Sequence, residues 1–275
     1  MKKKIKLFDP SINRSEENLV IKVLKSGFWA SGGGQGYVEK FENKFREYIG
    51  TKSCIAVNSG TSALNLALSL VDIKNKEVIV PSLTFVSTIH SIILNGGKPI
   101  FVDVDPKTLC LDPKKIVEKI TKKTKIILPV HFAGMPCEIT KILKISNDYN
   151  CKVIEDAAHA SGTTYKNKKI GSHGFAVCFS FHPVKNLAMP TGGAISINDK
   201  NHEEITKRLF AKRWCGITNR KNYDYDVKEM GWNYYMNEFS ASIGLIQLKK
   251  LDKMNSIRRK IAKRYHDEIN SEKIM

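Results

Sequence analysis

An alternation of short apolar runs with segments of helical pattern, between Ser53 and Ile197, constrains the fold of this chain more than any other feature. Short apolar runs bounded by Gly, Pro or polar turns are typical of buried strands. The expected strands are Cys54–Val57, Glu77–Val80, Pro99–Val104, Lys125–Val130, Lys152–Glu155, Val177–Phe181 and Ala194–Ile197. Repeated strand–helix units predict an α/β fold with a mainly parallel (mixed) sheet of the seven-stranded type, flanked by helices.

Helices are expected between these strands and at both ends of the chain. Their signals are capping residues, first-turn acids and apolar residues at helical spacing. The expected segments are a helix with Ser15 as N-cap that stops at Gly27, one along Val38–Tyr48, and others at Thr84–Leu94, after Asp112-Pro113, and at Glu138–Ser146. The chain is expected to be helical after Asn201, and Phe239–Ile269 fits either one long helix or two broken ones.

Composition narrows the class of protein. The 275 residues fit one large domain or two smaller ones, and a hydrophobic content of 42% is sufficient for a globular core. No apolar run is long enough to span a bilayer, and the basic N-terminus lacks the apolar region of a signal peptide. The six cysteines form no CxxC pair, so neither a metal site nor a disulfide framework is expected. Free thiols in the cytoplasm are the expected state.

The formal net charge of +18 has three interpretations. It could serve nucleic-acid binding, attract anionic substrates such as nucleotides, or reflect lysines spread over solvated faces. The lysines are dispersed, and no RNA-binding motif or basic patch with interleaved aromatic residues is present. We therefore expect solvated lysines with some steering of anionic substrates, and no nucleic-acid partner.

The stretch Gly171–Gly193 contains the most informative lysine of the chain. Lys185 follows an apolar strand and precedes the Gly192-Gly193 turn, where backbone can approach a ligand closely. A lysine in a partly dry site loses its proton more easily, and the free amine can form a Schiff base. Taken alone, Lys185 would more often be a loop lysine that reaches solvent.

A possible phosphate site follows the first strand. Ser59, Gly60, Thr61 and Ser62 lie where a strand passes into a helix N-terminus, and in such sheets ligands bind outside the carboxyl ends of the strands. Free backbone amides, hydroxyls and the helix dipole together form a cradle for phosphate. An ordinary capped helix start would use the same residues.

Three further candidates lie at other strand ends. Asp156 follows an apolar strand and could pair with a cationic ring nitrogen, although it could also cap a helix. His159 could contact the same ligand or be a structural histidine. Phe85 could stack on a planar ring or pack in the core. Together with the lysine and the phosphate cradle, these groups match the needs of pyridoxal phosphate (PLP).

Several longer stretches recur in one enzyme family. They are FENKFREYIG, AVNSGTSALNLAL, EVIVPSLTFVST, PIFVDVDPKT, KTKIILPVHFAG, VIEDAAHASG, CFSFHPVKN with the following GG, and GWNYYMNEFSASIGLIQL. On these motifs the chain resembles the sugar aminotransferases of the DegT/DnrJ/EryC1/StrS family, over about residues 15–260. The resemblance implies the type I (aspartate aminotransferase) fold and PLP as the cofactor.

The resemblance also implies a role for each residue around the cofactor ring. Lys185 would be the catalytic Schiff-base lysine, and Asp156 would pair with the pyridine nitrogen. His159 would lie near the ring hydroxyl, and Phe85 would stack on the ring. No metal site is implied.

Phosphate binding is implied for a second group of residues. Gly60, Thr61 and Ser180 would hold the phosphate of their own subunit, and Asn233 would reach that of the partner, because the family's sites lie at a homodimer interface. The chain departs from the family at Tyr235, where the usual residue is arginine, and this removes a positive charge.

A second departure concerns domain organisation. The resemblance implies an N-terminal arm and helix over 1–36, a PLP-binding large domain over 37–235, and a long helix over 236–275 that leads into a C-terminal small domain. Family members continue past this helix, so the small domain is expected to be truncated. A split enzyme, or a non-catalytic PLP-binding remnant, is the alternative interpretation.

The expected activity is the transfer of an amino group, with glutamate as donor, to a keto carbon of a nucleotide-linked deoxy sugar. This activity would serve surface polysaccharide or deoxyaminosugar biosynthesis. The family also has a dehydratase branch with histidine at the lysine position, and Lys185 argues against that branch.

Overall fold

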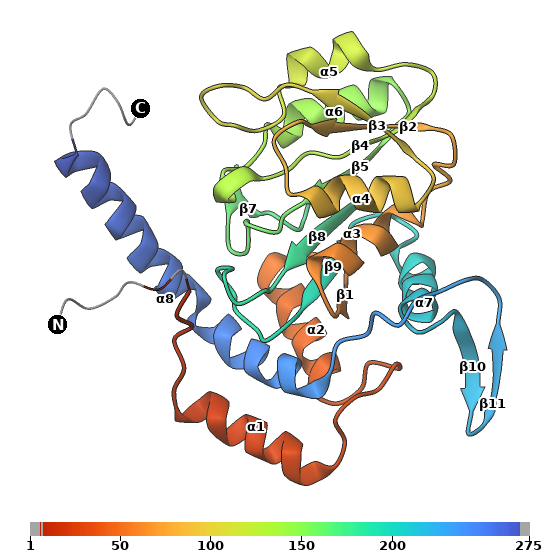
Figure 1. Cartoon of the computed structure of the whole chain (residues 1–275), viewed down its shortest axis with the longest axis vertical. Helices are drawn as coiled ribbons and strands as arrows, with labels where there is room; N and C mark the ends of the chain where they lie inside the picture. Colours follow the sequence, from red (N-terminus) through yellow and green to blue (C-terminus); the bar gives the residue numbers. More distant parts are fainter. Residues whose placement is uncertain (1–5, 7, 270–275) are drawn as a thin grey trace.

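A seven-stranded sheet forms the centre of the molecule (Figure 1). The computed structural model describes residue 6 and residues 8–269. The sheet, in the order β1-β9-β8-β5-β4-β2-β3, comprises β1 (Ser53–Val57), β2 (Glu77–Pro81), β3 (Lys98–Val102), β4 (Thr124–Ile127), β5 (Lys152–Asp156), β8 (Ala176–Ser180) and β9 (Gly193–Ile197). Strand β9 runs antiparallel to both β1 and β8, and the remaining pairs are parallel. The predicted mixed, mainly parallel sheet is confirmed.

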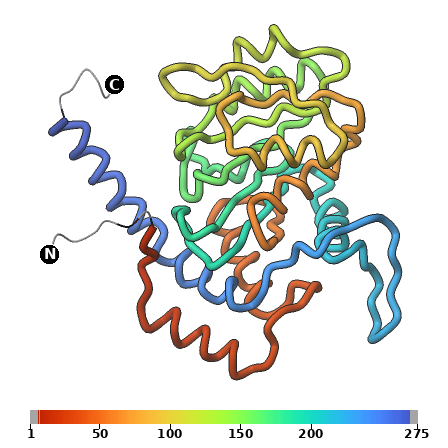
Figure 2. The backbone as a smooth tube through the Cα atoms, in the orientation of Figure 1, coloured from red at the N-terminus to blue at the C-terminus, as the bar shows by residue number. Residues whose placement is uncertain are grey.

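Helices cover both faces of this sheet, and α1 packs on α8. The helices of the described residues are α1 (Arg14–Ser26), α2 (Tyr37–Ile49), α3 (Gly60–Leu68), α4 (Val86–Leu94), α5 (Pro113–Lys119), α6 (Ile139–Asp148), α7 (His202–Arg213) and α8 (Glu238–Glu268), with the short 3₁₀ helix η1 (Phe132–Gly134). Residues Phe239–Ile269 were expected to form either one long helix or two broken ones, and α8 is one continuous helix. Figure 2 shows it passing α1 and α2 and then leaving the body of the molecule, and residues 257–269 are exposed.

The alternation of side chains along each strand divides the core into layers. Ile55 and Val57 of β1 pack with α3, α4 and α7 on one face, whereas Cys54 and Ala56 face α2 and α8 on the other. A third cluster places α5 and α6 over the far half of that second face. Because both faces are covered, the strands are apolar at nearly every position, which is why they were recognisable in the sequence.

Several element ends differ from the prediction. The N-cap of α1 is Asn13 rather than Ser15, because the Asn13 side chain accepts from the Ser15 amide while the Glu16 carboxylate accepts from the Asn13 amide. This pair is a capping box, and Asn13 with Glu16 has its spacing. Strand β4 stops at Ile127 instead of Val130, since Pro129 has no N–H to continue the ladder.

Two hairpins were not predicted. They are β6 (Thr164–Tyr165) with β7 (Lys168–Lys169), and β10 (Ile217–Lys221) with β11 (Asp224–Val227). The second projects from the body of the molecule in Figure 1, and most of its residues are exposed. The expectation that the chain is helical after Asn201 is therefore wrong over β10 and β11. Tyr223, Tyr225 and Val227 alternate with polar residues there, but all three are exposed, so the alternation marks no buried face.

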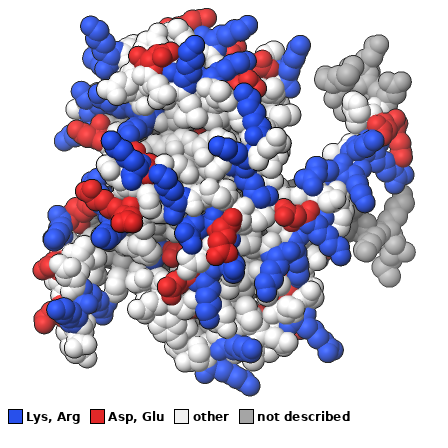
Figure 3. Space-filling model, turned by 180° about the vertical axis from the view of Figure 1, so that it is seen from behind, with Lys and Arg blue, Asp and Glu red and all other residues white. Residues whose placement is uncertain are grey.

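The surface is basic without a single concentrated patch in the view of Figure 3, where Lys and Arg are spread over the whole face with Asp and Glu between them. None of the helices in the described residues combines the length and apolar character needed to cross a bilayer.

Candidate active site

The carboxyl ends of β1, β2, β5 and β8 meet at one edge of the sheet, and a cavity of about 350 Å³ opens there. This is the position at which parallel sheets place their ligands. Seven of the predicted site residues line the cavity, namely Gly60, Thr61, Phe85, Asp156, His159, Ser180 and Lys185. These residues are separated by up to 125 positions in the chain and are brought together by the sheet order.

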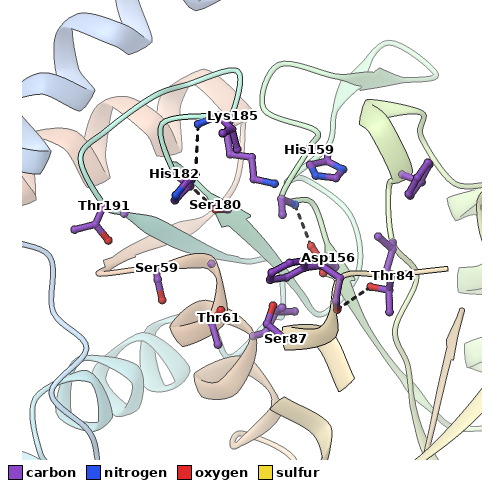
Figure 4. Close-up of a pocket in the computed structure, with 18 residues that line it drawn as sticks. Ser59, Thr61, Thr84, Ser87, Asp156, His159, Ser180, His182, Lys185 and Thr191 are labelled. Carbon is purple, nitrogen blue, oxygen red and sulfur yellow. Dashed lines mark hydrogen bonds between the residues drawn. The ribbon is translucent and has the colours of Figure 1, made fainter. Parts of the chain in front are cut away.

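Lys185 lies in the loop between β8 and β9, and its amine points into the cavity in Figure 4. The loop turns tightly here, since the Lys185 amide donates to the His182 carbonyl at 2.8 Å. Burial lowers the pKa of the Lys185 amine, and the nearby Asp156 carboxylate opposes this shift. A larger share of Lys185 is therefore in the nucleophilic, uncharged form than for an exposed lysine at the same pH.

Asp156 ends β5 and is only 4% exposed. Its Oδ1 accepts from the Ala158 amide at 3.0 Å, and its Oδ2 accepts from the Thr88 hydroxyl at 2.8 Å. The carboxylate is thus held by two donors while its side chain lines the cavity. Such a carboxylate can pair with a cationic group on a ligand.

His159 is held by the neighbouring η1 turn. The Ala133 amide lies 3.3 Å from His159 Nδ1, so Nδ1 accepts and the imidazole proton of the neutral ring is on Nε2. Ala133 adopts a left-handed conformation with φ of 50°, which is uncommon for a residue with a Cβ. Burial, and secondarily the charge of Lys185, lower the pKa of His159, so the neutral imidazole is favoured.

Phe85 is the N-cap residue of α4 and is 73% exposed at the edge of the cavity. It does not belong to the buried core, which was the alternative interpretation of this residue. An exposed phenyl ring beside a cavity is suited to cover the face of a planar ligand.

The start of α3 closes the other side of the cavity. Ser59 caps the helix by accepting from the Ser62 amide, and the Gly60 and Thr61 amides belong to the first turn, which has no carbonyl partners within the helix. A Cβ on Gly60 would lie 2.7 Å from the Cβ of Ser180, so only glycine allows this approach. The result is a compact cradle of amides and hydroxyls suited to a phosphate.

These groups fit PLP as a set. The cradle at Gly60, Thr61 and Ser180 suits its phosphate, Asp156 suits its pyridine nitrogen, and Lys185 suits its aldehyde. No cluster of three or more candidate metal ligands occurs in the part of the chain that the structure describes.

Asn233, the eighth predicted residue, is not part of the cavity lining. It is exposed, its carbonyl accepts from the Asn58 side chain at 3.3 Å, and its backbone bridges to Trp214. A side chain directed to another subunit's site would lie outside its own cavity, so the role of Asn233 stays a prediction.

Sequence reasoning missed other residues at the site, namely Ser87, His182 and Thr191 in the lining and Thr88 behind Asp156. Thr88 was hidden within an apolar helical run. Its link to the site is the hydrogen bond to Asp156, 68 residues away, so the local sequence carries no signal for it.

Comparison with known proteins agrees with this geometry. The DegT/DnrJ/EryC1/StrS aminotransferase family matches residues 10–274. The spore coat polysaccharide biosynthesis protein SpsC of Bacillus subtilis is 40% identical over 262 residues, covering 93% of this chain and 67% of SpsC. GDP-perosamine synthase of Escherichia coli O157:H7 is 38% identical over 270 residues, covering 98% of this chain and 72% of that enzyme.

A solved structure of a putative sugar aminotransferase has the same fold as this chain. The putative sugar aminotransferase Spr1654 of Streptococcus pneumoniae, in its PLP form, superposes with a TM-score of 0.89 at 28% identity, covering 96% of this chain and 71% of that one. The same protein has also been solved in a PMP form. The predicted fold is confirmed, and PLP is confirmed as the cofactor at the level of the family. The chain belongs to the DegT/DnrJ/EryC1/StrS aminotransferase family.

Proposed function

We propose that this chain is a PLP-dependent aminotransferase that moves an amino group from glutamate to a keto carbon of a nucleotide-linked deoxy sugar. One observation carries the proposal: an amine with a lowered pKa, a buried carboxylate and a phosphate cradle share one cavity. The names of the relatives support the substrate class, since two of them are GDP-perosamine synthases and a third belongs to spore coat polysaccharide biosynthesis.

The residues of the chain would divide the work. When bound, PLP supplies an aldehyde that takes up an amino group and a ring that accepts electrons. Lys185 would hold the cofactor and, once released, would move a proton to and from the substrate carbon through Nζ. Asp156 would keep a proton on the ring nitrogen, and His159 would donate from Nε2 to the ring hydroxyl.

Surface charge and assembly complete the proposal. An excess of basic residues favours the approach of a nucleotide-linked sugar, because its diphosphate group is negatively charged. We infer a homodimer with two shared sites, in which Asn233 reaches the partner's phosphate site; its exposed position outside its own cavity supports this. The six free cysteines support a cytoplasmic location.

The test is a half-reaction followed by absorbance. Purified protein is loaded with PLP and mixed with glutamate in the absence of any sugar. The visible absorbance of lysine-bound PLP should disappear and the band of pyridoxamine phosphate should grow. The product is then offered GDP-, UDP- and dTDP-linked keto-deoxy sugars, and the sugar that restores the starting spectrum identifies the acceptor. An unchanged spectrum with glutamate, in protein shown to contain PLP, would contradict the transaminase proposal and favour a non-catalytic binder.

A further inference from the structure

Two threonine hydroxyls connect the mouth of the cavity with Asp156. Thr88 Oγ1 lies 2.8 Å from Asp156 Oδ2, and Thr84 Oγ1 lies 2.8 Å from Thr88 Oγ1. Thr88 is fully buried and Asp156 nearly so. In such a setting a hydrogen bond to a carboxylate is stronger than in water.

The direction of both bonds follows from the available protons. An ionised carboxylate can only accept, so Thr88 gives its single hydroxyl proton to Asp156. The Thr88 oxygen must then accept from Thr84. The other acceptor near Thr84 Oγ1, the Phe85 carbonyl, lies farther away at 3.5 Å. The order of donation is therefore Thr84 to Thr88 to Asp156.

The second oxygen of Asp156 is also fixed. Oδ1 accepts from the Ala158 amide at 3.0 Å, so each oxygen has one donor and the plane of the carboxylate cannot rotate freely. Each oxygen keeps a further lone pair for a ligand. The carboxylate is thus oriented before any ligand arrives.

The same helical turn also sets the position of Phe85. Thr88 lies three residues after Phe85, and its amide donates to the Phe85 carbonyl at 3.0 Å. The first turn of α4 therefore places a phenyl ring at the cavity and a hydroxyl on the carboxylate as one rigid unit.

We propose that Thr88, oriented by Thr84, is a positioning residue that keeps the Asp156 carboxylate aimed at the pyridine nitrogen. A carboxylate held in this direction can pair with a protonated ring nitrogen and so favours the proton on nitrogen. Without the Thr88 hydroxyl, Oδ2 loses its fixed direction and this pairing weakens. The role rests on the proposed function, because it requires PLP in the cavity.

The experiment compares four variants with the wild-type protein. Thr88→Val removes the hydroxyl at nearly constant volume, and Thr88→Ser restores it. Thr84→Val removes the second donor. Thr124→Val is the matched control: Thr124 is also buried and also donates to a carboxylate, that of Glu77 at 3.3 Å, but both residues begin their strands at the opposite end of the sheet.

Three quantities are measured for each protein. They are the ¹⁵N NMR signal of PLP labelled at the ring nitrogen, the rate of the glutamate half-reaction, and the unfolding temperature of the cofactor-free protein. In Thr88→Val the nitrogen signal should move toward that of unprotonated pyridine. The half-reaction should slow about tenfold to a hundredfold, the equivalent of one hydrogen bond to a charged group. Thr88→Ser should restore both quantities.

The other two variants distinguish an effect on the orientation of the Asp156 carboxylate from a general effect on the stability of the protein. Thr84→Val should move the nitrogen signal in the same direction by less, and it keeps the test valid if Thr88→Val does not fold. Thr124→Val should lower the unfolding temperature and leave the nitrogen signal at its wild-type value. A wild-type nitrogen signal in Thr88→Val, or in Thr84→Val if the former does not fold, would overturn the inference whatever happens to rate or stability. Wild-type protein that takes up no PLP would refute the proposed function and this inference together.

Discussion

Lys185 combines a positive charge with a half-buried position, and we expect this to destabilise the cofactor-free protein at neutral pH. Burial lowers its pKa, so below the folded-state pKa the charged amine destabilises the fold. As the pH rises from that pKa toward 10.5, the value of an ordinary lysine, the cost disappears. Function accounts for a charge at a place where stability would favour an apolar side chain.

Replacing Lys185 by Met should therefore raise the unfolding temperature of the cofactor-free protein at pH 7. The difference in unfolding temperature between the variant and the wild type should shrink as the pH approaches 10, because Lys185 of the folded wild-type protein is then uncharged. Thermal unfolding without PLP at several pH values measures this difference. A variant that is less stable than wild type at pH 7 would show that the amine makes favourable contacts that outweigh its desolvation.

Lys185 is also the residue that borohydride should trap. Reduction of the PLP-loaded protein followed by peptide mapping should tag Lys185, and another tagged lysine would contradict the assignment.

Lys185→Ala should still bind PLP, more weakly, because the cradle at Gly60, Thr61 and Ser180 relies on amides and hydroxyls. Transamination should fall by several orders of magnitude, since the covalent link and the proton carrier are lost together.

At the scale of elements, the close approach of the α3 start to the end of β8 defines the cradle. Gly60→Ala would place its Cβ 2.7 Å from that of Ser180, so the two ends must move apart. We expect a loss of about 1–3 kcal/mol in unfolding free energy, typical of overpacking, and a clear rise in the dissociation constant for PLP. Gly33→Ala is the control, because its Cβ would meet only the Ser31 hydroxyl at 3.4 Å. Equal PLP affinity in both variants, measured by titration, would argue against a phosphate site at Gly60.

Elements with a buried face were predictable from the sequence, and those without one were not. The strands of the central sheet were found because both of their faces are apolar. The β10–β11 hairpin was missed because its side chains face solvent: Tyr223, Tyr225 and Val227 alternate with polar residues, but this alternation marks no buried face. Six of the lining residues were proposed from their place after a strand, and Ser180 came from the family resemblance. Thr88 acts through a tertiary contact with Asp156, 68 residues away, that no local pattern encodes.

At the scale of the whole molecule, shared sites would allow two inactive variants to restore one another. A mixed dimer of Lys185→Ala with Asn233→Ala has one site with both defects and one with neither. After unfolding and refolding together in equal amounts, the mixture should regain up to about a quarter of wild-type activity, given two-fold symmetry. Activity that stays at the level of the separate variants would show that each chain completes its own site. Light scattering on the same samples gives the oligomeric state.

Because β1 pairs with a strand that is synthesised much later, it cannot complete its hydrogen bonding early in translation. In the central sheet β1 pairs with β9, from Ser53 opposite Ile197 to Val57 opposite Gly193. On the ribosome β9 follows β1 by roughly 135 residues, which at about 5–20 residues per second amounts to on the order of ten seconds. During that interval an apolar strand waits without its neighbour, and Gly60 has not yet met Ser180. Nascent chains released before β9 is synthesised would be exposed to aggregation and proteolysis. A chain that can bind PLP has already formed the β1–β9 pair and the contact of Gly60 with Ser180.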